Sequence, residues 1–159
     1  MIFFCPNCWS QVREEEKTCP ECQEEVEPLD QIGYFDKLTR ALHHPVAATR
    51  MRAACILGEI GDKRGIKPLA DLIDQAWETE NLFFLREIAI ALGKIDGDMV
   101  VPALVRLLDH PSFLVREAAL KALPKGKNKR AAAAVRKALN DPSPNVRDLA
   151  GKFWQKISE

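Results

Sequence analysis

The sequence lacks any apolar run that could cross a bilayer, which takes about 20 residues. It also lacks the features of a secretory signal, because its start, MIFFCPNC, has no basic region and only a short apolar run. We therefore expect no membrane association and a cytoplasmic, reducing environment. Cysteines in that environment more often bind metal ions than form disulfides.

Familiar catalytic patterns are missing as well. The sequence has no Gly-rich phosphate loop and no HExxH motif. Ser, His, Asp and Cys occur only as isolated residues and form no recognisable Ser/His/Asp or Cys/His catalytic set. We expect a protein that is not an enzyme and has no small-molecule substrate.

Net charge is also missing, but the balance conceals two different segments. Lys and Arg number 23, and so do Asp and Glu. Residues 1–32 carry two basic and eight acidic side chains, whereas residues 33–159 carry 21 basic and 15 acidic ones. Apolar residues make up 47% and charged residues 29% of the chain, as in folded proteins. The contrast indicates two segments that are built differently.

The acidic segment contains two Cys-x-x-Cys pairs, Cys5 with Cys8 and Cys19 with Cys22. Two such pairs allow four thiolates to converge on one tetrahedral ion, and zinc keeps thiols deprotonated at neutral pH. The segment is too short to build a core, so a metal ion would supply its stability. Two disulfides or a redox-active pair are the alternatives. We predict a structural zinc site, because four protein ligands leave no open position for catalysis.

This segment resembles the zinc-ribbon modules found at the N-terminus of bacterial and archaeal proteins. The resemblance implies a zinc ribbon at residues 1–26, and an acidic linker punctuated by Pro and Gly then follows at residues 27–33. In such modules a Gly usually follows the second Cys of each pair. Trp9 and Gln23 occupy those positions here.

The remaining residues repeat a helical pattern. Within Val100–Pro124, two helices with apolar stripes flank a His-Pro turn, and neither helix could bury its stripe alone. Related units are aligned by Arg50, Leu85, Arg116 and Arg147. Successive positions in that series are 35, 31 and 31 residues apart. Such a period in a helical pattern is typical of a stacked-repeat solenoid.

These repeats resemble the HEAT-like family, in the short form first noticed in phycobilin lyases. The resemblance covers residues 33–159 and implies an all-α fold, a right-handed α-α superhelix of four helix pairs. The pairs would occupy residues 34–64, 65–97, 98–127 and 128–159. The resemblance also implies a scaffold whose concave face, lined by the second helix of each pair, binds a protein partner.

The recurrent Arg residues resemble the family's Arg at the start of the second helix. There the Arg usually pairs with an Asp six residues earlier, and the pairs form a ladder between layers. Only Asp141 keeps that Asp, and His44 and His110 replace it. We predict a structural role for these Arg residues. For His43, His44 and His110 we predict turn capping rather than metal binding. Cys55 lies among Ala, Ile and Leu and is expected to be a small buried side chain.

A basic stretch gives an alternative partner. Between residues 118 and 140 the sequence has no acidic side chain and seven basic ones: Lys121, Lys125, Lys127, Lys129, Arg130, Arg136 and Lys137. Such an edge could neutralise phosphates, which makes nucleic acid the alternative to a protein partner. A solvated turn or a dock for the acidic N-terminal segment is the plainer interpretation.

The first spacing in the series is four residues longer than the other two, which places four extra residues in the second repeat. Aromatic residues flank these extra residues. Trp77 is the candidate for a surface contact with a partner, because an inserted loop often carries a binding residue. Burial in the helical stack is expected for Phe83 or Phe84, since one helix face needs such a side chain.

Overall fold

The computed structural model describes residues 3–5, 7–8, 10–13, 16–25, 33–77, 81–124 and 128–158. The chain divides into two compact units, Met1–Ala53 and Ala54–Glu159. In the described part, a two-stranded sheet precedes eight α-helices. None of the described helices is long and apolar enough to span a bilayer.

The first unit begins with a small antiparallel sheet. β1 (Phe3–Phe4) pairs with β2 (Gln11–Val12), with Phe3 opposite Val12. An isolated antiparallel bridge joins Thr18 to Glu25. These short pairings bring two turns close together, and each turn carries one of the Cys-x-x-Cys pairs.

Eight α-helices follow the sheet in the part of the chain that the structure describes. They are α1 (Tyr34–Ala41), α2 (Ala47–Ile60), α3 (Ile66–Ala76), α4 (Leu82–Lys94), α5 (Val101–Leu107), α6 (Phe113–Ala122), α7 (Lys129–Ala138) and α8 (Pro144–Ser158). Short 3₁₀ turns, η1 (Lys63–Gly65) and η2 (Asp98–Val100), precede α3 and α5. The boundary between the two units falls within α2.

Side chains and backbone geometry define the helix ends. The Asn81 side chain accepts a hydrogen bond from the backbone N–H of Phe83 and caps α4, and Asn128 caps α7 in the same way. Gly61, with φ +68, follows the last residue of α2, where a left-handed residue satisfies the final carbonyls. Local sequence therefore defines the start of α4 and α7 and the end of α2.

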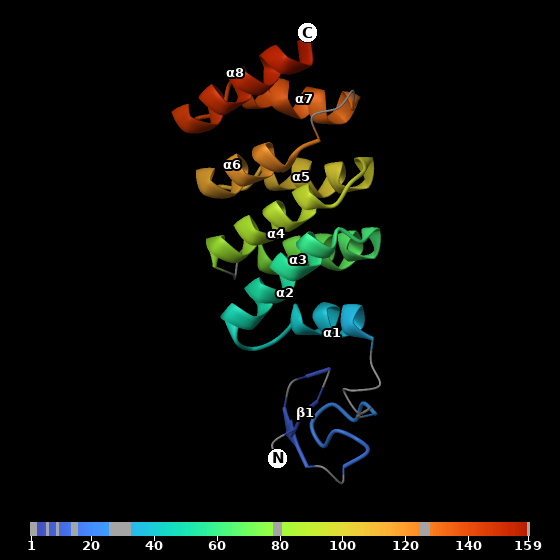
Figure 1. The fold of residues 1–159 in the computed structure, drawn as a ribbon. Helices are drawn as coiled ribbons and strands as arrows, with labels where there is room; N and C mark the ends of the chain where they lie inside the picture. Colours follow the sequence, from blue (N-terminus) through green and yellow to red (C-terminus); the bar gives the residue numbers. More distant parts are fainter. Residues whose placement is uncertain are drawn as a thin grey trace. The chain divides into compact units, whose positions relative to one another are not determined.

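In the second unit the helices stack in layers. α3 packs on α4, α5 on α6 and α7 on α8, while α4 contacts α6 and α6 contacts α8. Figure 1 shows the three pairs as successive layers. A stack in which each layer contacts its neighbours is a solenoid. The predicted all-α repeat class, preceded by an N-terminal cysteine cluster, is confirmed.

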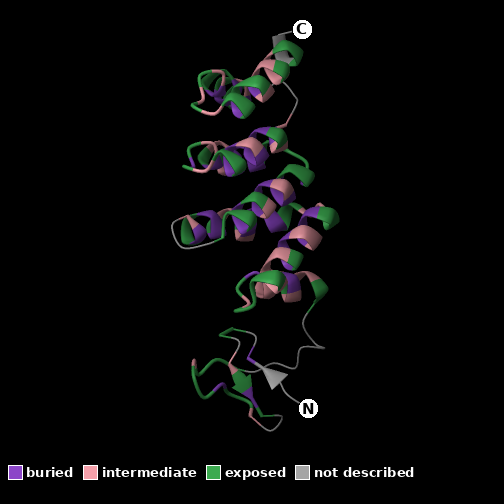
Figure 2. Ribbon diagram, turned by 90° about the vertical axis from the view of Figure 1, so that its left-hand side faces the viewer, coloured by how far each residue is buried: buried purple, intermediate pink, exposed green. Residues whose placement is uncertain are grey.

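The core of the second unit lies between these layers. Buried faces of the helices point toward the neighbouring helices, and exposed residues occupy the outer faces (Figure 2). The largest fully buried side chains are Leu57, Leu69, Ile73, Leu85, Ile88, Leu92, Val100, Val101, Leu104, Leu107 and Leu120. Leu85, which replaces the recurrent Arg, is completely buried and contributes apolar area where the other repeats have a charge.

Small residues allow the second helices to approach closely. A Cβ atom added at Gly58 of α2 would lie 2.7 Å from the Cα atom of Ala91 in α4. A Cβ atom at Gly93 of α4 would lie 2.7 Å from the Cβ atom of Ala122 in α6. Both distances are far shorter than an ordinary carbon contact of about 3.5–4.0 Å. The layer spacing at these points therefore requires glycine.

The turns before α2, α6 and α8 are capped in the same way by two residue types, His and Asp. The Nδ1 atom of His44 accepts a hydrogen bond from the N–H of Val46, and that of His110 accepts one from the N–H of Ser112, both at 3.0 Å. Oδ1 of Asp141 accepts from the N–H of Ser143 at 2.8 Å. His44 and His110 therefore perform the turn-capping task that the sequence predicts for them.

The recurrent Arg residues fasten these turns through the backbone. The Arg116 guanidinium donates to the carbonyl oxygens of His110 and Pro111, which lie six and five residues earlier. Arg50 and Arg147 donate to the equivalent carbonyls of their own turns. The expected partner six residues earlier is therefore a carbonyl oxygen and not a carboxylate.

The Asp side chain pairs with the Arg of the preceding layer. Nε and Nη2 of Arg116 each lie 2.8 Å from an oxygen of Asp141, and both side chains are about nine-tenths buried. Burial alone would raise the pKa of the Asp141 carboxyl, but the Arg116 hydrogen bond, the Ser143 N–H and the nearby Arg charges lower it below its usual range. This two-point ion pair connects consecutive repeats, as a structural role for Arg116 predicts.

Candidate functional site

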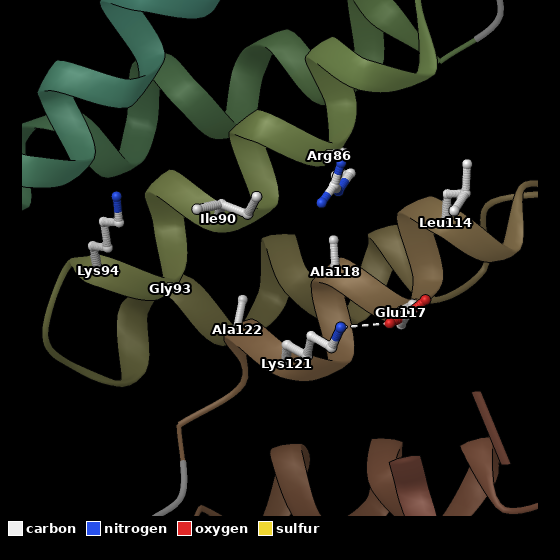
Figure 3. Close-up of a pocket in the computed structure, with 9 residues that line it drawn as sticks. All are labelled: Arg86, Ile90, Gly93, Lys94, Leu114, Glu117, Ala118, Lys121 and Ala122. Atoms are coloured by element: carbon white, nitrogen blue, oxygen red, sulfur yellow. Dashed lines mark hydrogen bonds and ion pairs between the residues drawn. The ribbon is translucent and has the colours of Figure 1, made fainter. Parts of the chain in front are cut away.

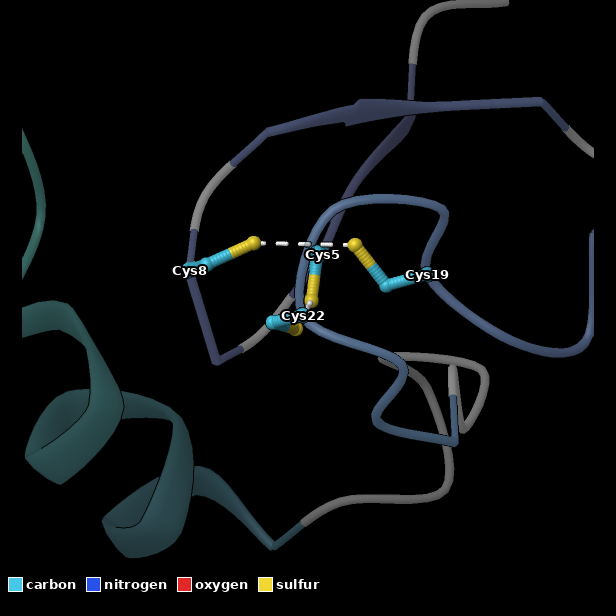
Figure 4. Close-up of side chains that lie close together, drawn as sticks. All are labelled: Cys5, Cys8, Cys19 and Cys22. Carbon is cyan, nitrogen blue, oxygen red and sulfur yellow. Dashed lines mark hydrogen bonds between the residues drawn. The ribbon is translucent and has the colours of Figure 1, made fainter.

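The four N-terminal cysteines converge. Their Sγ atoms all lie within 4.8 Å of one another, with Cys5 and Cys22 at 3.6 Å and Cys8 and Cys19 also at 3.6 Å (Figure 4). A tetrahedral zinc ion with Zn–S bonds of about 2.3 Å requires sulfur atoms about 3.8 Å apart. The arrangement therefore fits four thiolates around one ion. It unites the four residues that the spacing predicts.

The two cysteine turns have the same backbone bonding. The N–H of Cys5 donates to the carbonyl of Ser10, and the N–H of Cys19 donates to the carbonyl of Glu24, five residues ahead in both cases. Cys5 and Cys19 are fully buried, whereas Cys8 is exposed. Each turn thus contributes one enclosed and one more accessible sulfur atom.

Hydrogen bonds to sulfur prepare the site for a cation. The Ser10 hydroxyl lies 3.0 Å from Sγ of Cys8 and 3.1 Å from Sγ of Cys19. This hydroxyl is the main reason that the pKa of Cys8 is lowered and that the pKa of Cys19 falls to about 6. Backbone N–H and amide donors of Asn7 reach Cys5 and Cys22 at 3.4 and 3.7 Å. Such donors support thiolate ligands from outside the coordination shell.

Without a cation, the ionisation of one thiol disfavours the ionisation of its neighbours. At Cys22 a backbone hydrogen bond near Glu24 favours the thiolate, but desolvation and the neighbouring Cys8 and Cys5 thiols raise its pKa to about 11. Four negative charges in so small a volume repel one another, and a divalent cation removes that repulsion. The donor set and its electrostatics therefore suit a metal ion.

One turn of this module carries a backbone strain that the sequence suggested. Gln23, which follows Cys22 where related modules usually have Gly, has φ +58. A left-handed backbone costs a non-glycine residue roughly 1–2 kcal/mol. The turn geometry is thus retained despite the missing Gly. Trp9, at the corresponding position of the first pair, lies outside the described residues.

Cys55 takes no part in this cluster. It lies on α2 and is half-buried rather than enclosed, so the predicted burial is partial. The metal-ligand group among the described residues thus contains the four predicted cysteines.

Trp77 directly follows the last residue of α3 and packs against side chains of the next layer. Its ring meets the ring of His110 edge to face, with centroids 5.0 Å apart, and the Arg106 guanidinium lies 5.7 Å from its centroid. Arg106 also forms an ion pair with Asp74. Trp77 is consequently half-buried, and only part of its ring is available to a partner. Phe84 is buried and Phe83 is 53% exposed, so one of the two is buried, as predicted.

The basic residues predicted for nucleic acid lie at several places on the last two layers. Lys121 of α6 pairs with Glu117 on the same helix, and Lys137 of α7 pairs with Asp109 at 2.5 Å. Lys129 and Arg130 begin α7, while Arg136 and Lys137 lie at its other end, about 10 Å along the axis. Lys125 and Lys127 lie outside the described residues. The described members of the proposed phosphate-binding edge are therefore spread over α6 and both ends of α7.

A groove lies between the second helices of two adjacent repeats. We name it the α4–α6 groove and define it by Arg86, Ile90, Gly93, Lys94, Leu114, Glu117, Ala118, Lys121 and Ala122, which enclose about 340 Å³. Figure 3 shows Arg86 extending from α4 toward Ala118 of α6, with Ile90 beside it. The second-helix face was predicted as a binding surface, but these residues were not predicted.

Two known families match the helical region. Residues 83–153 match the family model for HEAT repeats, and residues 49–75 match the model for the PBS lyase HEAT-like repeat. No curated protein matches the chain. The first matched stretch begins in α4 and ends in α8, and so includes the whole of the α4–α6 groove.

Proposed function

Because the helices of this chain form HEAT-like repeats, we propose that the protein is a non-enzymatic, cytoplasmic adaptor that binds a protein partner through its second helices. HEAT repeats generally mediate interactions between proteins. The single observation that supports this surface is a set of exposed apolar side chains where α4 and α6 begin. The set consists of Leu82, Phe83, Phe113 and Leu114.

These side chains adjoin the α4–α6 groove. Leu114 lines it directly, and Phe83 lies three residues before Arg86, on the same face of α4. A helical stack gains nothing by leaving two Phe and two Leu side chains in water, since each buried Leu or Phe contributes roughly 1.5–3 kcal/mol. A protein surface that covers them would recover part of that free energy.

The test uses one groove variant and one matched control. Leu114→Asp places a charge at the groove entrance, and Met99→Asp places the same charge at another exposed apolar residue, in η2. We expect the parent protein and Met99→Asp to capture the same partner from nuclease-treated extract of the native host, and Leu114→Asp to lose it. Equal capture by both variants, with unchanged circular dichroism, would refute the use of this face.

For the cysteine cluster we propose a structural zinc ion held by all four thiolates. The sulfur spacing and the lowered pKa of Cys19 support four-thiolate coordination. Zinc analysis of the purified protein should give one ion per chain, Cys19→Ser should lose it, and Cys55→Ser should keep it. Iron, or a zinc content that Cys19→Ser does not change, would contradict the proposal.

A further inference from the structure

The α4–α6 groove has a charge pattern that identifies the chemistry of its ligand. Arg86, Lys94 and Lys121 supply three positive charges and Glu117 supplies one negative charge. The floor between them is apolar and consists of Ile90, Ala118 and Ala122. Resting on the proposed adaptor function, we propose that the groove binds an extended acidic peptide segment of the form acidic-x-apolar-x-acidic.

The available volume suits a single apolar side chain. The groove encloses about 340 Å³, at the lower end of the range of about 300–1,000 Å³ typical of ligand pockets. Its floor offers an Ile side chain from one helix and two Ala methyl groups from the other. A Leu or Phe side chain fits in that space against Ile90 and leaves room for neighbouring peptide atoms.

The spacing of the positive charges sets the spacing of the acidic residues. Arg86 and Lys94 are eight residues apart on α4, so they lie about 12 Å apart along the helix axis. In an extended peptide, side chains alternate between two faces, and residues four apart are separated by about 13 Å. Two acidic residues at positions 1 and 5 therefore match this spacing while the residue at position 3 points to the floor. Lys94 is directed to Glu59 of α2, so it must turn toward the peptide.

Arg86 is the strongest of the three contacts. It is exposed and has no hydrogen-bond or ion-pair partner among the residues that the structure describes. A guanidinium group can bind a carboxylate through two parallel hydrogen bonds, and the Glu117 carboxylate of the same groove is paired with Lys121. The geometry leaves this cation ready for a ligand.

The lysines are paired, but only weakly. Lys94 lies 2.5 Å from Glu59, and both side chains are exposed to solvent. Lys121 pairs with Glu117, four residues away on the same helix (Figure 3). Exposed pairs of this kind contribute about 0–1 kcal/mol, so a ligand carboxylate can share or replace the partner.

The same features disfavour a nucleic acid in this groove. A phosphate chain needs a continuous row of positive charges, whereas here an apolar floor separates Arg86 from Lys94 and the Glu117 carboxylate faces the cleft. An acidic peptide uses both the charges and the floor.

The test measures binding of short peptides to the full chain by fluorescence anisotropy. The probes are fluorescein-labelled Gly-Glu-Ser-Leu-Ser-Glu-Gly, the same peptide with both Glu changed to Gln, the same peptide with Leu changed to Ser, and a labelled thymidine oligonucleotide. We expect the first peptide to bind about tenfold more tightly than the second and the third, because each of these lacks one class of contact.

Protein variants locate the site. Arg86→Gln should weaken the Glu peptide about tenfold and leave the Gln peptide unchanged. The matched control Arg136→Gln, also an exposed Arg without a partner among the described residues, should have no effect. Equal binding of the Glu and Gln peptides, preference for the oligonucleotide, or insensitivity to Arg86→Gln would overturn the proposal.

Self-association and the adaptor function are judged separately. If sedimentation shows a dimer that Arg86→Gln dissociates, a second copy occupies the groove and the proposal fails. If Leu114→Asp loses the captured partner while the peptides show no acidic preference, the adaptor function stands and the acidic ligand is refuted.

Discussion

Replacing Gly58 by Ala tests whether direct contact between second helices sets the layer spacing. Gly58 is buried near the end of α2, and its Cα faces the backbone of Ala91 in α4. A new Cβ atom would lie 2.7 Å from Cα, 3.0 Å from Cβ and 3.1 Å from the carbonyl oxygen of Ala91. Two of these atoms belong to the backbone, so no side-chain rotation relieves the contact.

Two opposing terms determine the size of the effect. Alanine is a better helix former than glycine by about 1 kcal/mol. Overpacking costs typically 1–3 kcal/mol, and the upper end applies because α4 must move by nearly 1 Å. We therefore expect Gly58→Ala to lower the free energy of unfolding by about 1–2 kcal/mol.

Gly151→Ala is the matched control. Gly151 lies inside α8, and a Cβ atom added there meets nothing within 4 Å. This variant should gain up to about 1 kcal/mol from helix propensity alone. The two substitutions are chemically identical, so opposite signs isolate the interlayer contact.

The assay is urea unfolding followed by circular dichroism at 222 nm, with the midpoint compared at unchanged slope. Gly58→Ala should shift the midpoint to lower urea and Gly151→Ala to higher urea. Equal stabilisation of both variants would show that the close approach of α2 and α4 does not limit the packing and that Gly58 is not required there.

Three other predictions concern charge and backbone strain. Asp141→Asn should cost roughly 3 kcal/mol, since it leaves a buried Arg without its ion pair, whereas Asp109→Asn, in an exposed pair, should cost less than about 1 kcal/mol. Because the folded-state pKa of Asp141 is lowered, its stabilisation is present above the unfolded pKa of 3.8 and is lost as pH falls through the folded value. The free energy of unfolding of Asp141→Asn should therefore depend less on pH in acid than that of the parent. Gln23→Gly should relieve a left-handed backbone and raise the chelator concentration needed to remove the metal, and an unchanged concentration would argue against strain there. Charge reversal of Lys129 and Arg130 should abolish salt-dependent retention on a nucleic-acid column if α7 binds phosphates, and unchanged retention would remove that alternative.

The sequence predicts the helices well because local signals determine their ends. Asn81, Asn128 and Gly61 occur at positions where capping chemistry is readable without the fold. The four-cysteine cluster was equally predictable, because its spacing brings two turns to one ion.

Contacts between layers were harder to predict. The Arg116–Asp141 pair spans 25 residues, and its existence depends on the spacing between successive turns. The family resemblance correctly indicated a structural Arg and a ladder of Arg–Asp pairs between layers, but it did not show which Arg pairs with Asp141. The α4–α6 groove depends on how two helix faces meet, and periodicity alone does not determine that. The contact of Trp77 with His110 arises in the same way, because the two residues come from different layers.

The His110 imidazole makes one interlayer turn more sensitive to acid than an aspartate at the same place would. Its Nδ1 atom must stay unprotonated to accept the Ser112 N–H, and burial, the largest influence, lowers the pKa of His110 below 6.5. Protonation is therefore resisted in the folded chain, and its stability begins to decline as pH falls below the unfolded value of 6.5. At the equivalent place Asp141 keeps its acceptor down to far more acidic solution. Exchange of one residue type for the other leaves the architecture intact and resets the pH at which a repeat starts to open.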